Sequence, residues 1–249
     1  EGVVLARDLV NEPGGSLTPQ VFARKVTRMA KEKGLTVKVM DETAIKKAGF
    51  GGLLGVNRGS DHPPRFVELT YRPKGKAKAT LALVGKGVTF DSGGLSIKPW
   101  QGMSEMKTDM GGAAAVVGAM SVLSSLAPKI RVKGYLPMTD NMLGGDATRP
   151  GDVLKIRNGK TIEVINTDAE GRLILCDALT YANQFEPTYV IDIATLTGAV
   201  IGALGKLTTG MLSNNDELAQ LLLQSGTSSG DRAWQLPIWE EYDEQLDSN

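Results

Sequence analysis

The sequence predicts an α/β fold. Apolar runs rich in β-branched residues alternate along the chain with helical stretches, and this alternation is typical of α/β domains. The chain has 249 residues, of which 41% are hydrophobic and 22% are charged, so it is able to bury a sizeable core. A single α/β unit of this size is common, and we therefore expect one domain over residues 1–249.

The first part of the chain is expected to form one helix and several strands. Thr18 can cap a helix that runs to about Lys33, and Gly34 is a natural stop for it. A turn-like, lysine-rich loop, PKGKAK, separates the last two predicted strands. The expected strands are residues 35–40, 64–72 and 79–90.

The second part continues the alternation. The expected elements are a Gly-Ala-rich helix from about 112 to 126, a strand at 130–137, a hairpin with arms at 153–157 and 161–165, a helix ending near 183, a strand at 189–196 and a helix at 215–225. Asn158-Gly159 is a strong turn signal for the hairpin. Asn214 or Asn215 can cap the last helix.

Composition excludes several classes of function. Lys plus Arg and Asp plus Glu both number 28, so no global field attracts nucleic acid or anionic lipid. The single cysteine, Cys176, excludes an internal disulfide and fits a reducing, cytoplasmic compartment. No run approaches the roughly 20 uninterrupted apolar residues of a membrane span, and residues 1–20 lack a signal-peptide pattern.

The first candidate site follows the predicted strand 79–90. Asp91 comes directly after this strand, and ligands of α/β sheets bind beyond the carboxyl ends of strands. Lys86 lies within the same apolar strand, where a lysine is costly unless it is paired, neutral or coordinating. Either an ion pair with a core carboxylate or a ligand role explains it, and local sequence does not decide between them.

A second candidate is the segment NTDAEGR after residues 161–165. If it is extended, Asp168, Glu170 and Arg172 point to the same side. Carboxylates that lie so close repel each other unless cations lie between them. Helix capping is the alternative explanation for Asp168, but it does not account for Arg172.

A third acid, Asp109, precedes the Gly-Ala-rich helix, and by itself it is explained by the helix dipole. Together with Asp91, Asp168 and Glu170 it would form one carboxylate-rich cleft if the strands are neighbours. Hard oxygen ligands suit Mg, Mn or Zn, and two ions about 3.5–4 Å apart activate water and polarise a carbonyl. We expect His62, in a proline-rich turn, to be a surface residue.

Other mechanisms fit poorly. The segment around Lys86 lacks the Ser or Thr and the glycine spacing of a P-loop. Ser92 has no G-x-S-x-G context, so a serine hydrolase would need unusual partners. Cys176 lies in an apolar helix, and we expect a buried structural thiol.

Three segments carry a family resemblance: VGKGVTFDSGGLSIKP, MKTDMGGAAAV and NTDAEGRLILCDAL, in that order. They resemble the catalytic core of the leucyl aminopeptidases, the hexameric two-metal exopeptidases of the M17 type, over essentially the whole chain. The resemblance implies a mixed, mostly parallel β-sheet flanked by helices on both faces, as in zinc exopeptidases. It also implies release of N-terminal residues, preferably leucine and other apolar ones, from peptides in the cytoplasm.

The resemblance also implies a role for each site residue. Asp91 and Glu170 would bridge two divalent ions (Zn or Mn, with Mg as a further candidate), Lys86 and Asp109 would complete one metal site, and Asp168 would complete the other. Lys86 would be neutral as a ligand. Lys98 would stabilise the gem-diolate formed when metal-activated water attacks, and Arg172 would hold a bicarbonate ion as general base. The implied substrate-binding residues are Met106, Asn166, Thr195, Leu196 and Gly198.

Family members carry a smaller N-terminal domain and a further C-terminal part of the catalytic domain, and the resemblance implies that both are absent from residues 1–249. Some relatives bind DNA, and here that role would depend on the N-terminal domain because the net charge is zero. An inactive scaffold is the third hypothesis, which the intact ligand set disfavours. Plant relatives make a plastid an alternative compartment.

Overall fold

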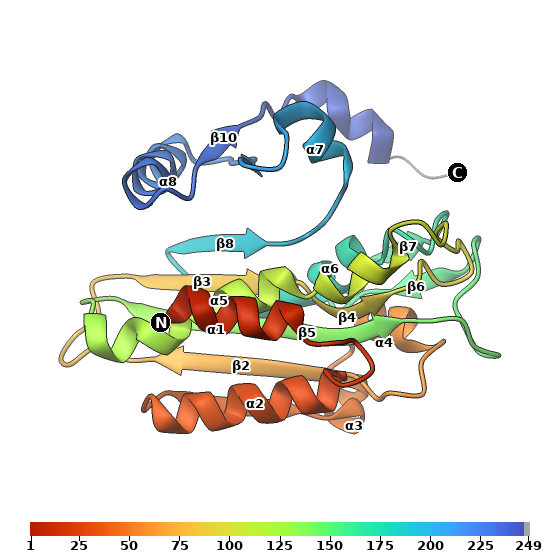
Figure 1. The fold of residues 1–249 in the computed structure, drawn as a ribbon, viewed down its shortest axis with the longest axis horizontal. Helices are drawn as coiled ribbons and strands as arrows, with labels where there is room; N and C mark the ends of the chain where they lie inside the picture. The colour runs from red at the N-terminus through yellow and green to blue at the C-terminus, as the bar shows by residue number, and fades with distance from the viewer. Residues whose placement is uncertain (247–249) are drawn as a thin grey trace. The chain divides into compact units, whose positions relative to one another are not determined.

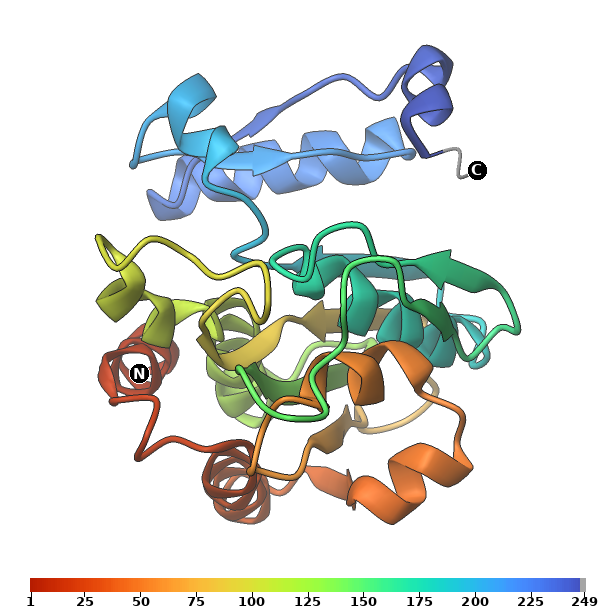
Figure 2. The same cartoon turned by 90° about the vertical axis from the view of Figure 1, so that its right-hand side faces the viewer.

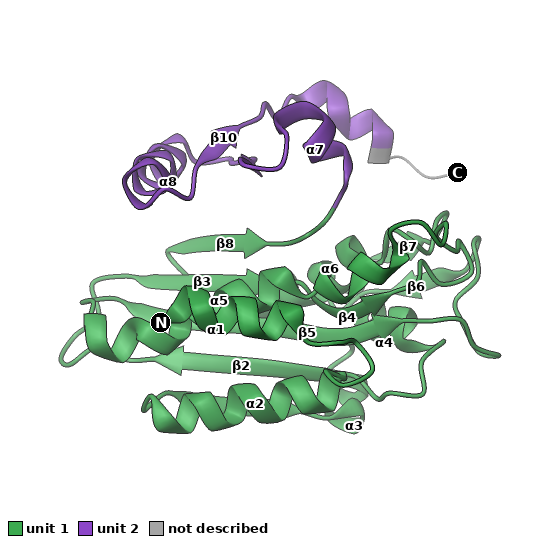
Figure 3. Cartoon of the chain, in the orientation of Figure 1, with its two compact units in different colours: residues 1–196 green, residues 197–249 purple. Residues whose placement is uncertain are grey.

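The computed structural model describes residues 1–246, and the chain divides into two compact units, Glu1–Leu196 and Thr197–Asn249 (Figure 3). The first unit contains the central sheet and every predicted metal ligand. The second unit contains helices and a short parallel strand pair. The prediction of one catalytic domain over residues 1–249 stays a prediction.

A mixed sheet forms the centre of the first unit, and residues 1–196 supply its six strands (Figure 1). Its strand order is β1-β2-β5-β3-β8, with β4 also paired to β5. The β1–β2 and β2–β5 pairs are antiparallel, whereas β5 runs parallel to β3 and β4, and β3 runs parallel to β8. The strands are β1 (Thr36–Met40), β2 (Arg65–Tyr71), β3 (Thr80–Gly85), β4 (Gly87–Asp91), β5 (Arg131–Asn141) and β8 (Tyr189–Ile193).

Helices cover both faces of this sheet (Figure 2). On one face, α1 (Gly2–Asn11), α2 (Pro19–Glu32) and α5 (Gly111–Leu126) bury an apolar core against alternate residues of β2 such as Val67 and Leu69. On the other face, α3 (Glu42–Lys47), α4 (Gly51–Asn57) and α6 (Glu170–Asn183) pack on Phe66 and Val84. This arrangement confirms the predicted α/β class with a mixed sheet between two helical layers.

Sequence signals explain several element boundaries. The Thr18 side chain accepts a hydrogen bond from the backbone N–H of Val21 at the start of α2, and Gly34 adopts a φ of +68° after its end. The hairpin β6 (Val153–Lys155) and β7 (Thr161–Glu163) forms around Asn158-Gly159 as expected. The structure adds α1, α3 and α4, which the sequence pattern did not reveal.

The prediction of one strand over residues 79–90 is wrong, because the chain breaks it at Lys86 into β3 and β4. Lys86 N–H donates to the carbonyl of Ile193 at 3.0 Å, and Lys86 O accepts from Ala113 N–H at 2.8 Å. These bonds tie the break to β8 and to the start of α5. The strand predicted at 130–137 extends instead to Asn141, where it pairs with Asp91.

Within the described residues, one helical segment, Met103–Leu126, is long enough and apolar enough to cross a membrane. However, 56% of its apolar window is buried inside the protein. It comprises a 3₁₀ helix, η1 (Met103–Thr108), and α5. Such burial is typical of a core helix, and α5 indeed packs on the sheet.

The second unit contains α7 (Ala199–Leu204), β9 (Thr209–Met211), α8 (Asp216–Ser229), β10 (Ala233–Gln235) and the 3₁₀ helix η2 (Glu240–Leu246). β9 and β10 pair in parallel. The Asn215 side chain accepts the N–H of Leu218 at 2.8 Å, which confirms the predicted cap of α8.

Candidate metal centre

The predicted acids meet beyond the carboxyl ends of the parallel strands. Asp91 ends β4, Asp109 precedes α5, and Glu170 is the first residue of α6. Asp168 lies two residues before the start of α6. Because β3, β4, β5 and β8 are mutually parallel, their carboxyl ends share one edge of the sheet, and the loops at this edge bring the acids together.

Three of these carboxylates lie close enough to share a cation. Asp91, Asp168 and Glu170 each offer one oxygen, and the three oxygens lie within 4.8 Å of one another. Asp91 and Glu170 are both only 2% exposed. Ionised carboxylates at such separations and burial repel each other strongly unless positive charge lies between them.

Lys86 supplies part of that positive charge. Its ammonium group lies 2.7 Å from Asp109 Oδ1 and 2.7 Å from Glu170 Oε1, and it donates to the carbonyl of Thr195 at 3.1 Å. Burial lowers the pKa of Lys86, but the carboxylates of Asp109 and Glu170 raise it more, so the net pKa lies above the ordinary lysine value. The interpretation of Lys86 as a lysine paired with core carboxylates is confirmed, and its ligand role stays a prediction.

Lys98 approaches the other two acids, at 2.8 Å from Asp91 Oδ2 and 2.5 Å from Asp168 Oδ1. Its loop turns sharply at Gly93, whose φ is +89° and where an added Cβ would lie 2.5 Å from the carbonyl oxygen of Ser96. Burial lowers the pKa of Lys98. Hydrogen bonds and charge from Asp168 and Asp91 raise it by more, so the net pKa lies well above the ordinary lysine value. Lys98 is therefore a cation in this site.

The donor set fits a divalent metal ion. Four carboxylates outnumber the two ammonium groups, and Asp109 Oδ2 is buried without a hydrogen-bond partner in residues 1–246. Burial raises the pKa of Asp109 and of Glu170, and neighbouring carboxylates raise it further against the lowering effect of Lys86. Extra positive charge would relieve this repulsion, and carboxylate oxygens suit hard cations.

The structure shows neither the extended form considered for NTDAEGR nor the capping role considered for Asp168. The segment is not extended, because α6 begins at Glu170, so Asp168, Glu170 and Arg172 do not alternate along a strand. Nor does Asp168 cap α6: the capping position is Ala169, which makes no side-chain capping bond. Arg172 is exposed and has no hydrogen bond or ion pair within the described part of the chain.

The predicted substrate residues lie in several different elements of the chain. Thr195 follows β8, and its hydroxyl donates to Asp109 Oδ1 at 2.8 Å. Leu196 lies beside Gly171 at the start of α6, and Met106 is half-buried in η1. The exposed Asn166 accepts the N–H of Asp168 at 2.9 Å. Gly198 belongs to the second unit, directly before α7.

Two polar residues beside the acids were missed. Asn141 ends β5 and donates to Asp91, and Thr167 links the loop after β4 to the segment before α6. The position of Asn141 after a buried strand was an available signal, whereas no local pattern marks Thr167. Cys176, expected to be buried, is only half-buried, and burial raises the pKa of its thiol.

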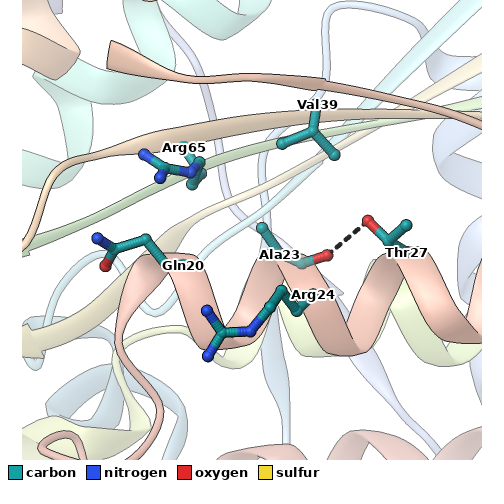
Figure 4. A pocket seen from close by; sticks show the side chains of 6 residues that line it. All are labelled: Gln20, Ala23, Arg24, Thr27, Val39 and Arg65. Atoms are coloured by element: carbon teal, nitrogen blue, oxygen red, sulfur yellow. Dashed lines mark hydrogen bonds between the residues drawn. The ribbon is translucent and has the colours of Figure 1, made fainter.

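A cavity of about 680 Å³ lies elsewhere, between the N-terminal half of α2 and strands β1 and β2 (Figure 4). Its lining includes Arg24 and Arg65 and contains no acid. The hydroxyl of Thr27 is already bonded to the carbonyl of Ala23 at 2.7 Å. None of the predicted site residues lines this cavity.

The fold and the cluster define an α/β domain with a candidate divalent-metal centre at the carboxyl edge of its sheet. The chain belongs to the cytosol aminopeptidase family, since the model of that family's catalytic domain matches residues 4–249.

Curated relatives agree with this assignment. The chain is 54% identical over 249 residues to a probable cytosol aminopeptidase of Aromatoleum aromaticum, covering all of this chain and 50% of the relative. It is 55% identical over 245 residues to one of Chlorobaculum tepidum, covering 98% of this chain and 49% of the relative. The chain thus spans about half the length of these curated relatives.

A similar solved structure is the bottromycin maturation enzyme BotP in complex with Mn. The match has a TM-score of 0.95 and 45% sequence identity, and it covers 99% of this chain and 54% of that one.

Proposed function

We propose that residues 1–249 form the catalytic domain of a two-metal aminopeptidase, which hydrolyses the N-terminal residue from peptides and prefers leucine and other apolar residues. The observation that carries this proposal is the cluster of Asp91, Asp168 and Glu170 with oxygens within 4.8 Å of one another, inside a domain of the cytosol aminopeptidase family.

Two divalent ions, Zn or Mn with Mg as a further candidate, would be held by five residues. These are Lys86, Asp91, Asp109, Asp168 and Glu170. The solved Mn complex of the similar protein BotP supports a divalent ion as the bound metal. When bound, such ions activate a water molecule and polarise the substrate carbonyl. A lysine ligand must lose its proton, so ion binding would compete with the present Lys86 ammonium pairs.

Lys98 is proposed to stabilise the gem-diolate, the negatively charged tetrahedral intermediate of amide hydrolysis. It is 20% exposed on its side chain and stays charged beside Asp91 and Asp168, so it can reach a substrate oxygen at the edge of the cluster. Arg172 is exposed and makes no hydrogen bond or ion pair among the described residues, which leaves its guanidinium available to an anion such as bicarbonate.

Substrate recognition is proposed to involve Met106, Asn166, Thr195, Leu196 and Gly198. Thr195 supports this best, because its hydroxyl and its carbonyl already contact Asp109 and Lys86. A homohexamer and a cytoplasmic location complete the proposal, and the names of the curated relatives support the location.

Removing one ligand tests the proposal. Asp91→Ala and Glu170→Ala should abolish metal-dependent hydrolysis of a leucyl amide, because each removes a carboxylate from the centre of the cluster. Asp146→Ala is a control, since Asp146 is a largely exposed acid paired with Arg58. Full activity in the two cluster variants would contradict the proposal.

A further inference from the structure

Two loops carry most of the proposed metal-site residues. The first, residues 91–98, starts at Asp91, the last residue of β4, and contains Lys98. The second, residues 166–170, contains Asp168 and ends at Glu170, the first residue of α6. Side-chain repulsion acts to separate these loops when the acids are ionised. Lys98 offsets part of this repulsion through its ion pairs with Asp91 and Asp168, and hydrogen bonds between the loops hold them together as well.

Asn141 provides one connection. It lies at the end of β5 and is 4% exposed. Its side-chain Nδ2 donates to Asp91 Oδ1 at 2.9 Å and to the carbonyl of Thr167 at 3.0 Å. Its own carbonyl accepts from the N–H of Ser92 at 3.0 Å and from the Ser92 hydroxyl at 2.8 Å. Both amide hydrogens are thus committed, one to each loop.

These bonds orient the Asp91 carboxylate. Oδ1 accepts from Asn141 and also from the N–H of Gly93 at 2.9 Å. Oδ2 is left facing Lys98 at 2.8 Å. One oxygen is anchored by the protein, and the other remains available to a cation.

Thr167 provides the second connection. Its hydroxyl donates to the carbonyl of Gly93 at 2.7 Å and accepts from the N–H of Ser96 at 2.8 Å. Its backbone N–H donates to Ser96 Oγ at 3.1 Å. Thr167 is buried and immediately precedes Asp168, so these bonds fix the start of the second loop against the first.

We infer that Asn141 and Thr167 are positioning residues that preorganise the metal site, although neither is a ligand. The inference rests on the proposed function, because it assigns these residues to the same divalent-metal centre. Groups that orient ligands typically contribute about 10–100-fold to metal affinity. Losing either connection should therefore weaken metal binding by about that factor.

The test is isothermal titration of Mn²⁺ into the full chain after removal of metal with a chelator. Asn141→Ala and Thr167→Val should each bind Mn²⁺ about 10–100-fold more weakly than the wild type. Thr167→Ser keeps the bridging hydroxyl and should restore nearly wild-type affinity.

Asn57→Ala is the matched control. Asn57 is also a buried asparagine with two committed amide hydrogens, which it donates to the carbonyl of His62 at 2.9 Å and to the hydroxyl of Thr139 at 3.0 Å, but it contacts no proposed ligand. Its loss should lower stability without changing Mn²⁺ affinity.

The outcomes separate the two proposals. A wild type that binds no Mn²⁺ overturns the proposed function itself. If the wild type binds Mn²⁺ and both Asn141→Ala and Thr167→Val bind it equally well, only the positioning role is overturned. An equal loss of Mn²⁺ affinity in Asn57→Ala would also overturn the positioning role, because the loss would then result from lower stability of the fold. If Asn141→Ala does not fold, the Thr167→Val and Thr167→Ser pair decides.

Discussion

Replacing Gly112 with alanine should destabilise the first unit, because α5 there approaches the backbone of β8 directly. A Cβ at this position would lie 1.9 Å from the carbonyl oxygen of Ile193, 2.7 Å from its carbon and 3.0 Å from the nitrogen of Lys86. The same Ile193 carbonyl accepts the N–H of Lys86 at 3.0 Å. The added methyl therefore meets backbone atoms that have no rotamer to change.

The size of the effect follows from these contacts. Relief requires α5 to move away by more than about 1 Å, since unstrained non-bonded contacts lie near 3.5 Å. Overpacking of this kind costs about 1–3 kcal/mol, and losing the Lys86–Ile193 bond adds about 1 kcal/mol. Better helix propensity offsets about 1 kcal/mol of this cost. A net loss of about 1–3 kcal/mol corresponds to a Tm that is lower by about 2–12 °C.

Thermal unfolding followed by far-ultraviolet circular dichroism measures this change. Gly145→Ala is the matched control, because a Cβ there meets nothing within 4 Å and the residue does not need a positive φ. A Gly112→Ala protein whose Tm stays within about 1 °C of the wild type would refute the close-contact argument.

Three further predictions concern the site and a buried acid. Lys98→Ala should lower kcat for a leucyl amide far more than it weakens Mn²⁺ binding, and equal losses in kinetics and titration would argue against a role in the transition state. Saturating Mn²⁺ at about 100 times its Kd should raise the Tm by about 5–11 °C, because it adds about 2.7 kcal/mol, and an unchanged Tm in differential scanning fluorimetry would count against a bound metal. Burial raises the pKa of Asp177 more than backbone hydrogen bonds from Arg157, Leu53 and Gly52 lower it. The carboxyl of Asp177 therefore keeps its proton to a higher pH in the folded state than in the unfolded state. The stability of the wild type relative to Asp177→Asn should be greatest below pH 3.8. It should fall as the pH rises through the raised pKa of the folded state. Urea unfolding at several pH values measures this difference, and a difference that grows with pH would be inconsistent with it.

Much of the fold was predictable because local signals agree with the tertiary structure. Thr18, Gly34 and Asn158-Gly159 mark boundaries that the structure keeps. The break at Lys86 was not predictable, because the hydrogen bonds that cause it come from Ile193 and Ala113, which are distant in sequence. Short helices such as α3 and α4 carry too few residues for a clear periodic pattern.

The acids of the site were predictable from their places at element junctions, and the structure brings Asp91, Asp168 and Glu170 together as expected. The partners of Lys86 and Lys98 were not predictable, because they depend on which loops meet at the edge of the sheet. Asn141 illustrates the limit: its side chain looks like any strand-end amide until β4 and the loop before α6 are placed beside it.

The count of divalent ions bound per chain tests the central claim most directly. Native mass spectrometry of the full chain, equilibrated with Mn²⁺ after chelation, should show about two ions on the wild type and fewer on Asp91→Ala. A wild-type chain that takes up no divalent ion under these conditions would contradict the assignment of the acidic cluster as a metal centre.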